Sequence, residues 1–363
     1  YIIQRVKNWR DTGRNLSEIA MLYRSNAQSR VLEEELLREN IPYRIYGGVR
    51  FYERLEIRNT LAYLRLLINR NDDAAFERVV NTPPRGIGNK TLETIRLFAR
   101  EQGFSMYEAA QGAVNNGVFT ARATNALNTF FALVDKLSSG VEELPLDELA
   151  EDVLRDSGLK EFHKMEKGER GQARVENLDE LVNACRVFES KEDDMLPLQE
   201  FLDAAALDAG DAQADEYEDA VQMMTLHSAK GLEFPLVFLA GVEENLFPHK
   251  MSVEDPDRLE EERRLCYVGI TRAMQKLVIS YAESRRMHGE ERVNSVSRFV
   301  REIPKELLQE VRIKATISRP VSFGRGSVSS SEAMPDYPGI SLGRRVLHGK
   351  YGEGVIVQIL GTG

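Results

Sequence analysis

Residues 221–242 read VQMMTLHSAKGLEFPLVFLAGV and form the most informative stretch of the chain. The apolar runs at its two ends are expected to form buried strands of a parallel sheet, because such strands are covered on both faces. The polar loop between them, residues 227–233, then follows the carboxyl end of the first strand. Open α/β sheets bind their ligands at that edge. The stretch therefore predicts an α/β domain with a ligand site in this loop.

Two side chains in this loop have chemistry suited to a nucleotide or a nucleic acid. The Glu233 carboxylate can accept hydrogen bonds from ribose hydroxyls, and His227 can donate a hydrogen bond to a DNA phosphate. The alternative is a capped turn that exposes a histidine and a glutamate without any ligand.

Residues 259–280, LEEERRLCYVGITRAMQKLVIS, predict a helix followed by another strand. Asp255 and Pro256 are a favourable N-cap and first helical residue, and the helix is expected to end near Thr271 and Arg272. An arginine held there by a rigid helix could reach the γ-phosphate of a nucleotide that lies between two domains. Such arginine fingers raise the rate of phosphoryl transfer about 10³–10⁵-fold. The alternative is an ordinary surface arginine at a helix end.

Other strands are expected at residues 16–24, 43–46 and 276–281, and the first two form a βαβ unit with a helix at 26–40. From about Gly47 onward, and before the strand that begins at residue 221, the apolar residues recur at helical spacing instead. Helices are expected there at residues 53–69, 74–80, 91–101, 121–137, 146–157 and 174–190.

An α/β unit interrupted by a helical block predicts one domain inserted into another. The α/β domain is expected to comprise residues 1–44 and 218–314, and the inserted helical domain residues 45–217. Residues 315–340 are rich in Ser, Pro and Gly and are expected to be a flexible linker. Short alternating runs and glycines in residues 341–363 predict the first strands of a small β-barrel.

The composition is typical of a soluble globular protein, with 42% apolar and 8% aromatic residues. No apolar run approaches the roughly 18 residues of a membrane span, and no signal peptide opens the chain. Cys185 and Cys266 lack metal-binding spacing and are expected to be reduced thiols. The net charge of −10 argues against nucleic acid at first, but the acidic residues are concentrated in two stretches. Phosphate binding depends on the local field, so basic patches could still bind DNA.

Residues 84–88, PRGIG, with the NKT that follows, predict a phosphate-binding turn. Gly86 and Gly88 would let backbone N–H groups approach a phosphate closely, and the next helix would present its positive end to that anion. Nothing in this segment reads base edges, so binding would not depend on DNA sequence. The alternative is a plain glycine-rich turn between helices.

These motifs and several further blocks resemble, in the same order, the UvrD/PcrA/Rep group of superfamily 1 DNA helicases. The further blocks are LYRSNAQSR (22–30), GGVRFYERLEIRNTLAYLRL (47–66), NTPPRGIG (81–88) and GQARVENLDEL (171–181). The resemblance covers nearly the whole chain. It implies an α/β, RecA-like second motor domain of P-loop NTPase type, called 2A, interrupted by a mobile helical domain, called 2B. It also implies that the C-terminal strands are Tudor-like.

Carried over onto the matching positions, the resemblance implies four kinds of site. The ATP-binding residues would be Glu233, Gly231 and Arg272, with Arg272 as the catalytic arginine finger. The residues that contact single-stranded DNA would be His227, Arg24 and Asn26. The residues that contact duplex DNA would be Arg85, Gly86, Ile87, Gly88 and Lys90. A β-hairpin at residues 284–294 would be the strand-separation pin, with Met287 and His288 at its tip; an ordinary solvated hairpin is the alternative.

The phosphate-binding loop of such an enzyme is missing, because GxxxxGK[ST] occurs nowhere in the chain. The Asp-Glu pairs at 147–148, 179–180 and 215–216 follow no buried strand, so none can be the magnesium-binding carboxylate pair. The chain is therefore expected to be the second half of the motor, inactive alone and without its own metal site. The expected cofactor is ATP with Mg²⁺, whose ligands would lie in an N-terminal RecA-like half.

The expected function is that of the C-terminal half of an ATP-dependent DNA helicase that moves 3′ to 5′ and unwinds duplex DNA in repair and replication. Its expected partners are single-stranded and duplex DNA, including junctions, the N-terminal half, and repair or transcription proteins that bind the C-terminal tail. The expected location is the bacterial cytoplasm, associated with the nucleoid and not with a membrane. The alternative is a non-catalytic DNA-binding or regulatory module that shares the fold.

Overall fold

A computed structural model describes residues 1–191, 194–210, 214, 218–282, 284–287, 290–311, 345–348 and 352–355. The chain divides into two compact units, Tyr1–Val311 and Arg312–Gly363. The first unit holds all the segments in which a site is expected, except for the C-terminal strands.

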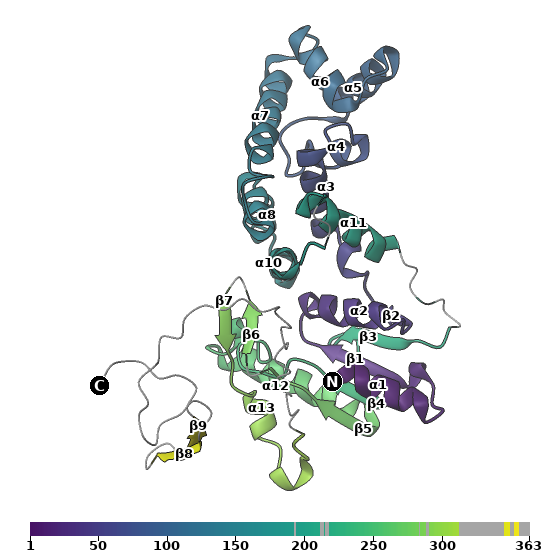
Figure 1. Ribbon diagram of the computed structural model, residues 1–363, viewed down its shortest axis with the longest axis vertical. Coiled ribbons are helices and arrows are strands. Elements are labelled where there is room, and N and C mark those ends of the chain that lie inside the picture. The colour runs from purple at the N-terminus through teal and green to yellow at the C-terminus, as the bar shows by residue number, and fades with distance from the viewer. Residues whose placement is uncertain are drawn as a thin grey trace, which may run out of the picture. The chain divides into compact units, whose positions relative to one another are not determined.

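The first unit contains a five-stranded sheet with the strand order β2-β3-β1-β4-β5 (Figure 1). All four pairs of neighbouring strands are parallel, which confirms the predicted α/β fold. The strands are β1 (Ile19–Tyr23), β2 (Tyr43–Ile45), β3 (Val221–Thr225), β4 (Phe234–Leu239) and β5 (Ala273–Ile279). Strand β5 begins directly after the preceding helix, three residues before the expected start.

Strand β3 lies between β1 and β2, so the two strands of the expected βαβ unit are not neighbours. The strand that follows the helical block is thus paired on both sides with strands that precede it, for example Met21 with Met223 and Tyr43 with Val221. Residues on the two sides of the inserted block therefore form one sheet.

Helices cover both faces of this sheet. Strand β1 is buried along its whole length, and its alternate residues belong to two separate cores: Ile19, Met21 and Tyr23 in one, and Ala20 and Leu22 in the other. The surrounding α-helices are α1 (Ile2–Asp11), α2 (Ser29–Arg38), α12 (Pro256–Thr271) and α13 (Arg298–Arg301). Short 3₁₀-helices are η1 (Leu16–Glu18), η2 (Asn26–Gln28), η4 (Lys250–Ser252) and η5 (Lys305–Leu307).

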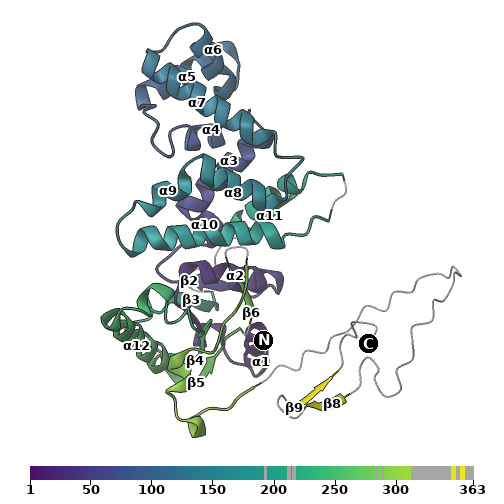
Figure 2. The same ribbon diagram turned by 90° about the vertical axis from the view of Figure 1, so that its left-hand side faces the viewer.

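The inserted block is helical, and its helices share one apolar core (Figure 2). After η3 (Phe51–Glu53) its helices are α3 (Leu55–Ile68), α4 (Asp73–Val79), α5 (Asn89–Gln102), α6 (Met106–Asn115), α7 (Ala121–Ser138), α8 (Leu146–Asp156), α9 (Leu159–Lys164), α10 (Glu169–Val187) and α11 (Pro197–Gly210). The six expected helices are confirmed. Helices α6, α9 and α11 were not anticipated: α9 is short, and the buried faces of α6 and α11 include alanines that make a weak apolar pattern.

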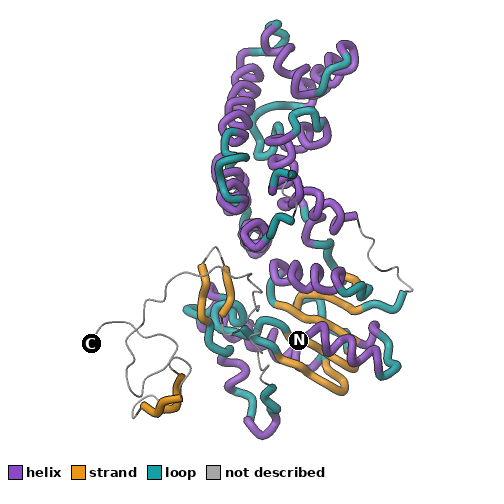
Figure 3. Tube along the Cα trace, viewed as in Figure 1, coloured by secondary structure: helices purple, strands orange, loops and turns teal. Residues whose placement is uncertain are grey.

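The hairpin expected at residues 284–294 is confirmed as the antiparallel pair β6 (Ser284–Met287) and β7 (Glu290–Val293), drawn in orange in Figure 3. His288 lies outside the described residues, and only the backbone of Met287 is described. In the second unit, β8 (Arg345–His348) and β9 (Gly352–Val355) form another antiparallel pair. The expected linker at residues 315–340 lies outside the described residues, and the small β-barrel stays a prediction.

Cys185 and Cys266 are free and buried, and they belong to different cores. Across the described ranges, the structure contains no helix that combines the length and the apolar character needed to cross a membrane.

Candidate nucleotide and nucleic-acid sites

The end of α12 and the end of the loop after β3 meet at the amino ends of β4 and β5. The Arg272 guanidinium donates a hydrogen bond from Nη1 to the Leu232 carbonyl at 2.7 Å, and the Phe234 N–H donates to the Arg272 carbonyl at 2.9 Å. Arg272 also donates from Nε to the Val268 carbonyl at 3.0 Å. The half-buried Arg272 side chain is thereby held against the residue that precedes Glu233. The two motifs, to which the resemblance assigns one nucleotide site, therefore lie next to each other in the fold.

The loop itself is a compact turn that exposes its polar side chains. The Ser228 N–H donates to the Thr225 carbonyl at 3.0 Å, and Ala229 is fully buried beneath the turn. Gly231 has φ +86°, a left-handed conformation that glycine adopts without strain. His227 and Glu233 are exposed. The Glu233 carboxylate is thus open to solvent next to the Arg272 anchor, as a contact with ribose hydroxyls would require.

Helix α12 begins as expected, because the Asp255 carboxylate caps it by accepting from the N–H groups of Asp257 and Arg258. Seven residues further along, Glu262 is 4% exposed and forms a forked ion pair with Arg24. Arg24 Nη2 lies 2.7 Å from Glu262 Oε1, and Nε lies 3.0 Å from Oε2. Burial alone would lower the pKa of Arg24, but the Glu262 carboxylate outweighs burial and raises it. The Arg24 guanidinium, which was predicted to bind DNA, is thus bound to the Glu262 carboxylate of α12.

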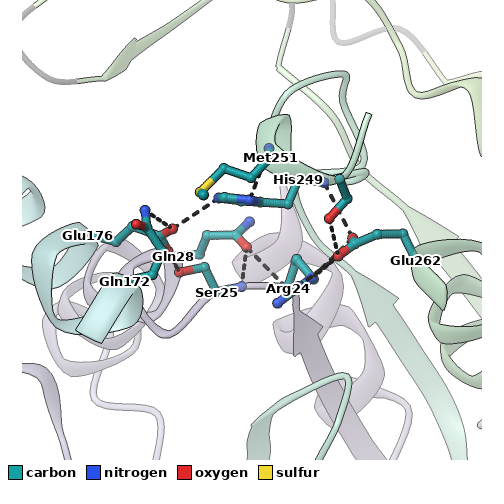
Figure 4. A network of polar contacts seen from close by, with 9 residues as sticks. Arg24, Ser25, Gln28, Gln172, Glu176, His249, Met251 and Glu262 are labelled. Atoms are coloured by element: carbon teal, nitrogen blue, oxygen red, sulfur yellow. Dashed lines mark hydrogen bonds and ion pairs between the residues drawn. The ribbon is translucent and has the colours of Figure 1, made fainter. Parts of the chain in front are cut away.

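A second carboxylate connects the helical block to the carboxyl end of β1, where Arg24 and Ser25 lie (Figure 4). Glu176 of α10 accepts from Ser25 Oγ at 2.5 Å and contacts His249 Nε2 at 3.0 Å. Burial raises the pKa of Glu176, but hydrogen bonds from His249, Ser25 and Gln172 outweigh it and lower the pKa to about 2. The His249 N–H in turn donates to Glu262 at 3.3 Å. Glu176 and Glu262 therefore belong to one polar network, which sequence analysis did not anticipate.

The other two residues expected to contact single-stranded DNA lie beside this network. Asn26 is exposed in η2, directly after Ser25. Partial burial and the nearby positive charge of Arg24 lower the pKa of His227, against the opposing effects of Glu169, Glu262 and Glu261. The lowered pKa favours the neutral imidazole of His227, which can still donate one N–H to a phosphate. The structure thus brings His227, Arg24 and Asn26 to one edge.

The glycine turn of the helical block is built around Asn81. Its side-chain oxygen accepts from the N–H groups of Arg85 at 2.8 Å and Ile87 at 3.1 Å, while Ile87 is buried. Gly86 has φ +85°, and Gly88 is the N-cap of α5. Lys90 is exposed in the first turn of that helix. The predicted phosphate-binding turn thus precedes a helix N-terminus, as expected.

Arg85 differs from expectation, because its guanidinium points into the fold. It donates to Tyr63 Oη at 2.6 Å and to the carbonyls of Val79, Pro83 and Ser157, each at 3.1 Å. It also lies over the ring of Phe130. The side chain therefore braces the turn from within.

The cation beside the turn is instead Arg122, an exposed residue of α7. A Cβ built on Gly86 would lie 3.4 Å from Arg122 Nη2. Arg122 could not be predicted from the sequence, because it is 36 residues from Gly86 and nothing local connects it with the turn. One signal was present: Arg122 is in the first turn of a helix, where the helix dipole disfavours a positive charge. An anion beside Arg122 would offset this unfavourable interaction with the helix dipole.

The chain is similar in sequence to a helicase family model and to known DNA helicases. Residues 1–284 match the family model described as the UvrD-like helicase C-terminal domain. The chain is 53% identical over 365 residues to DNA helicase II of Escherichia coli strain K12 and 48% identical over 365 residues to DNA helicase II of Haemophilus influenzae. It is 42% identical over 379 residues to the ATP-dependent DNA helicase PcrA of Bacillus subtilis strain 168.

All of the chain is covered in each of these three comparisons, together with 50%, 50% and 51% of the relatives. The chain thus spans about half the length of the curated relatives that it matches. The matches agree with the fold, a parallel sheet in which the loop after β3 begins at the carboxyl edge with His227 and ends at the amino ends of β4 and β5, where Leu232 contacts Arg272. On the family model and this fold, the chain belongs to the UvrD-like helicase C-terminal domain family.

Proposed function

We propose that the chain is the C-terminal half of an ATP-dependent DNA helicase that moves 3′ to 5′ along single-stranded DNA and unwinds duplex DNA. The observation that carries the proposal is the hydrogen bond from Arg272 to the Leu232 carbonyl, because it joins the helix end to the loop that presents Glu233. Relatives named DNA helicase II and ATP-dependent DNA helicase PcrA support the same activity.

In the proposed enzyme, Glu233 and Gly231 bind the nucleotide and Arg272 is the arginine finger. The exposed Glu233 carboxylate accepts hydrogen bonds from ribose hydroxyls, and the positive φ of Gly231 lets the loop turn toward the nucleotide. Arg272 stabilises the charge that develops on the transferred phosphoryl group. In this structure the Leu232 carbonyl accepts a hydrogen bond from Arg272 and so keeps the guanidinium next to the loop. A phosphate would replace the carbonyl because it is the stronger acceptor.

Magnesium binding is proposed for the N-terminal half. The described part of the chain contains no group of three or more His, Cys, Asp or Glu side chains that could hold a metal ion. In the proposed whole enzyme the ion accompanies ATP, and this chain supplies the loop and the arginine finger. We also place the protein in the bacterial cytoplasm with the nucleoid, and its C-terminal tail against repair or transcription proteins.

Single-stranded DNA is proposed to bind at the edge that holds Asn26 and His227. Both side chains are exposed there. Arg24 acts at this site mainly through position, because Glu262 already occupies one edge of its guanidinium. The β6–β7 hairpin is proposed as the strand-separation pin, with Met287 and His288 at its tip.

Duplex DNA is proposed to bind the turn at Gly86 and Gly88. Backbone N–H groups and the N-terminus of α5 bind one phosphate, and Lys90 and Arg122 add positive charge. Ile87 and Arg85 contribute by anchoring the turn in the helical block. Contacts of this kind recognise the backbone, so the proposed binding does not depend on DNA sequence.

The deciding experiment compares the 363-residue chain alone, the missing N-terminal half alone and a mixture of the two halves. DNA-stimulated ATP hydrolysis is expected only in the mixture, because only the N-terminal half would hold the phosphate-binding loop. Reproducible DNA-stimulated turnover by this chain alone would overturn the proposal. Absence of turnover in a mixture that forms a stable complex would favour a non-catalytic module.

A further inference from the structure

Residues 242–244 follow β4 and contact the chain on both sides of the β6–β7 hairpin. The Val242 N–H donates to the Ser280 carbonyl at 2.9 Å, in the segment that enters the hairpin. The Glu244 N–H donates to the Ser295 carbonyl at 3.0 Å, in the segment that leaves it. The base of the hairpin is therefore attached to the end of β4, a strand that has neighbours on both sides in the sheet.

The side chain of Glu243 holds the same base, and this residue is fully buried. Glu243 Oε2 accepts a hydrogen bond from the Ala282 N–H at 2.7 Å, two residues before β6 begins. Glu243 Oε1 accepts from Asn294 Nδ2 at 3.5 Å, directly after β7 ends. The strands themselves begin to pair at Ser284 and Val293. One carboxylate thus contacts both ends of the hairpin, next to the pair that closes it.

A carboxyl group that is removed from water costs free energy unless hydrogen bonds compensate for the lost hydration. For Glu243 the compensating donors include the two segments that flank the hairpin. Movement of either end of the hairpin would therefore deprive a buried carboxyl group of a donor. The position of the Glu243 side chain and the position of the hairpin base thus depend on each other.

A strand-separation pin must keep its orientation while the motor pulls the duplex against it. A hairpin that turned together with the duplex would let the separated bases pair again. We propose that Glu243 is a positioning residue for strand separation, whose side chain fixes the orientation of the β6–β7 hairpin relative to the sheet. The proposal rests on the proposed function, in which this hairpin is the pin.

The next residue, Glu244, has the same chemistry but a different partner. Its carboxylate accepts from the Arg298 N–H at 2.6 Å and from Arg298 Nη2 at 2.7 Å. Arg298 is the first residue of α13, which follows the hairpin. The Glu244 side chain therefore holds α13 and not the hairpin, which makes Glu244 a matched control for Glu243.

The test uses the full-length protein with Glu243→Ala, Glu243→Gln and Glu244→Ala. The unwinding rate of a tailed duplex is measured beside the rate of ATP hydrolysis stimulated by a single strand, because only unwinding needs the pin. Glu243→Ala should lower the unwinding rate about tenfold to 100-fold, the change in population expected when a buried N–H loses its acceptor. ATP hydrolysis on the single strand should stay unchanged. Glu244→Ala should leave the ratio of the two rates at its wild-type value.

Glu243→Gln keeps an acceptor at the same place. Its side-chain oxygen can still accept from the Ala282 N–H, and the Asn294 amide can turn its own oxygen toward the new amide group. This variant should therefore recover most of the unwinding rate.

Asn294→Ala removes only the contact with the far end of the hairpin and leaves the contact between Glu243 and Ala282 in place. It therefore tests the proposal even if Glu243→Ala does not fold. The unwinding rate should fall, again without an effect on ATP hydrolysis.

Two results would overturn the role of Glu243. If Glu243→Ala and Asn294→Ala unwind like wild type, the hairpin is supported instead by the contact between β6 and α10. If unwinding and ATP hydrolysis fall together in these variants, the side chain supports the fold in general and not the hairpin in particular.

A shortened hairpin separates this proposal from the proposed function. Replacing residues 286–291 by Asn-Gly, a sequence that favours a tight hairpin turn, removes the tip and keeps the base. If this variant unwinds like wild type, the hairpin is not the pin and the proposed function fails at that point. If it loses unwinding while Glu243→Ala and Asn294→Ala retain it, the pin stands and the role of Glu243 is wrong.

Discussion

Arg24 and Glu262 are 238 residues apart in sequence, yet Arg24 Nη2 lies 2.7 Å from Glu262 Oε1. The pair joins the carboxyl end of β1 to α12, the helix that ends next to Arg272. It also lies in the network that reaches Glu176 of the helical block through His249 (Figure 4). One ion pair thus connects the proposed single-strand site with the proposed nucleotide site.

Arg24→Ala should therefore destabilise the α/β unit by about 3–5 kcal/mol, because it leaves the buried Glu262 carboxylate without its cation. The double variant Arg24→Ala with Glu262→Met should recover much of that loss. The matched control is Arg264→Ala, whose ion pair with Glu261 is largely exposed and should contribute at most about 1 kcal/mol. Denaturant unfolding measures all three, and equal effects of Arg24→Ala and Arg264→Ala would contradict the prediction.

Arg272→Ala in the full-length enzyme should lower the kcat of DNA-stimulated ATP hydrolysis about 10³–10⁵-fold, because the finger acts in the transition state. DNA affinity should change little. Arg258→Ala, at an exposed position on the same helix, is the control and should keep wild-type kcat. A kcat for Arg272→Ala within about threefold of wild type would remove Arg272 from the catalytic role.

The junction between the helical block and the sheet is expected to lose stability in acid, because the Glu176 carboxylate lies there. Its pKa is lowered from 4.5 to about 2, so the stabilisation is fully present above pH 4.5 and is lost as pH falls toward 2. The shift corresponds to at most about 3 kcal/mol. Glu176→Gln should flatten the dependence of stability on pH in that window, whereas Glu161→Gln at an exposed site should not. Unfolding curves measured from pH 5 to pH 2 provide the comparison.

Gly86 and Gly88 should respond differently to substitution. Gly86→Ala forces a β-carbon onto a residue with φ +85° and should cost about 1–2 kcal/mol of stability. Gly88→Ser introduces a favourable N-cap into open space and should preserve stability. Both should weaken binding to a duplex junction, since each adds a side chain where a phosphate approaches. Equal losses for single-stranded DNA would show that the turn is only structural.

Arg85 and Arg122 form a matched pair of arginines around the same turn. Arg85→Gln should lower the Tm, because it removes the guanidinium that donates to the Tyr63 hydroxyl and to the carbonyls of Pro83 and Ser157. Arg122→Gln should leave the Tm unchanged and reduce the salt dependence of junction binding by a slope of about 0.9. The reverse result would mean that Arg85 binds the duplex and that Arg122 supports the fold.

The local sequence determined the elements and much of their order. Apolar runs identified the strands of the parallel sheet, and the Asp255–Pro256 signal located the start of α12, because periodicity and capping act over a few residues. The motif order also identified the family. Helices α6 and α11 were not predicted from the sequence, because their buried faces include alanines, whose small side chains contribute little to an apolar pattern.

Tertiary structure alone decided which partner each charged group has. The sequence does not distinguish an arginine that binds a phosphate from one that binds a carboxylate or a carbonyl. The partner is whichever acceptor the fold brings within about 3 Å of the guanidinium. Arg24 is bound by Glu262, Arg85 by groups inside the helical block, and Arg122 lies beside Gly86. Local sequence therefore determined where the motifs begin and end, whereas long-range packing determined which of their charges remain free for a ligand.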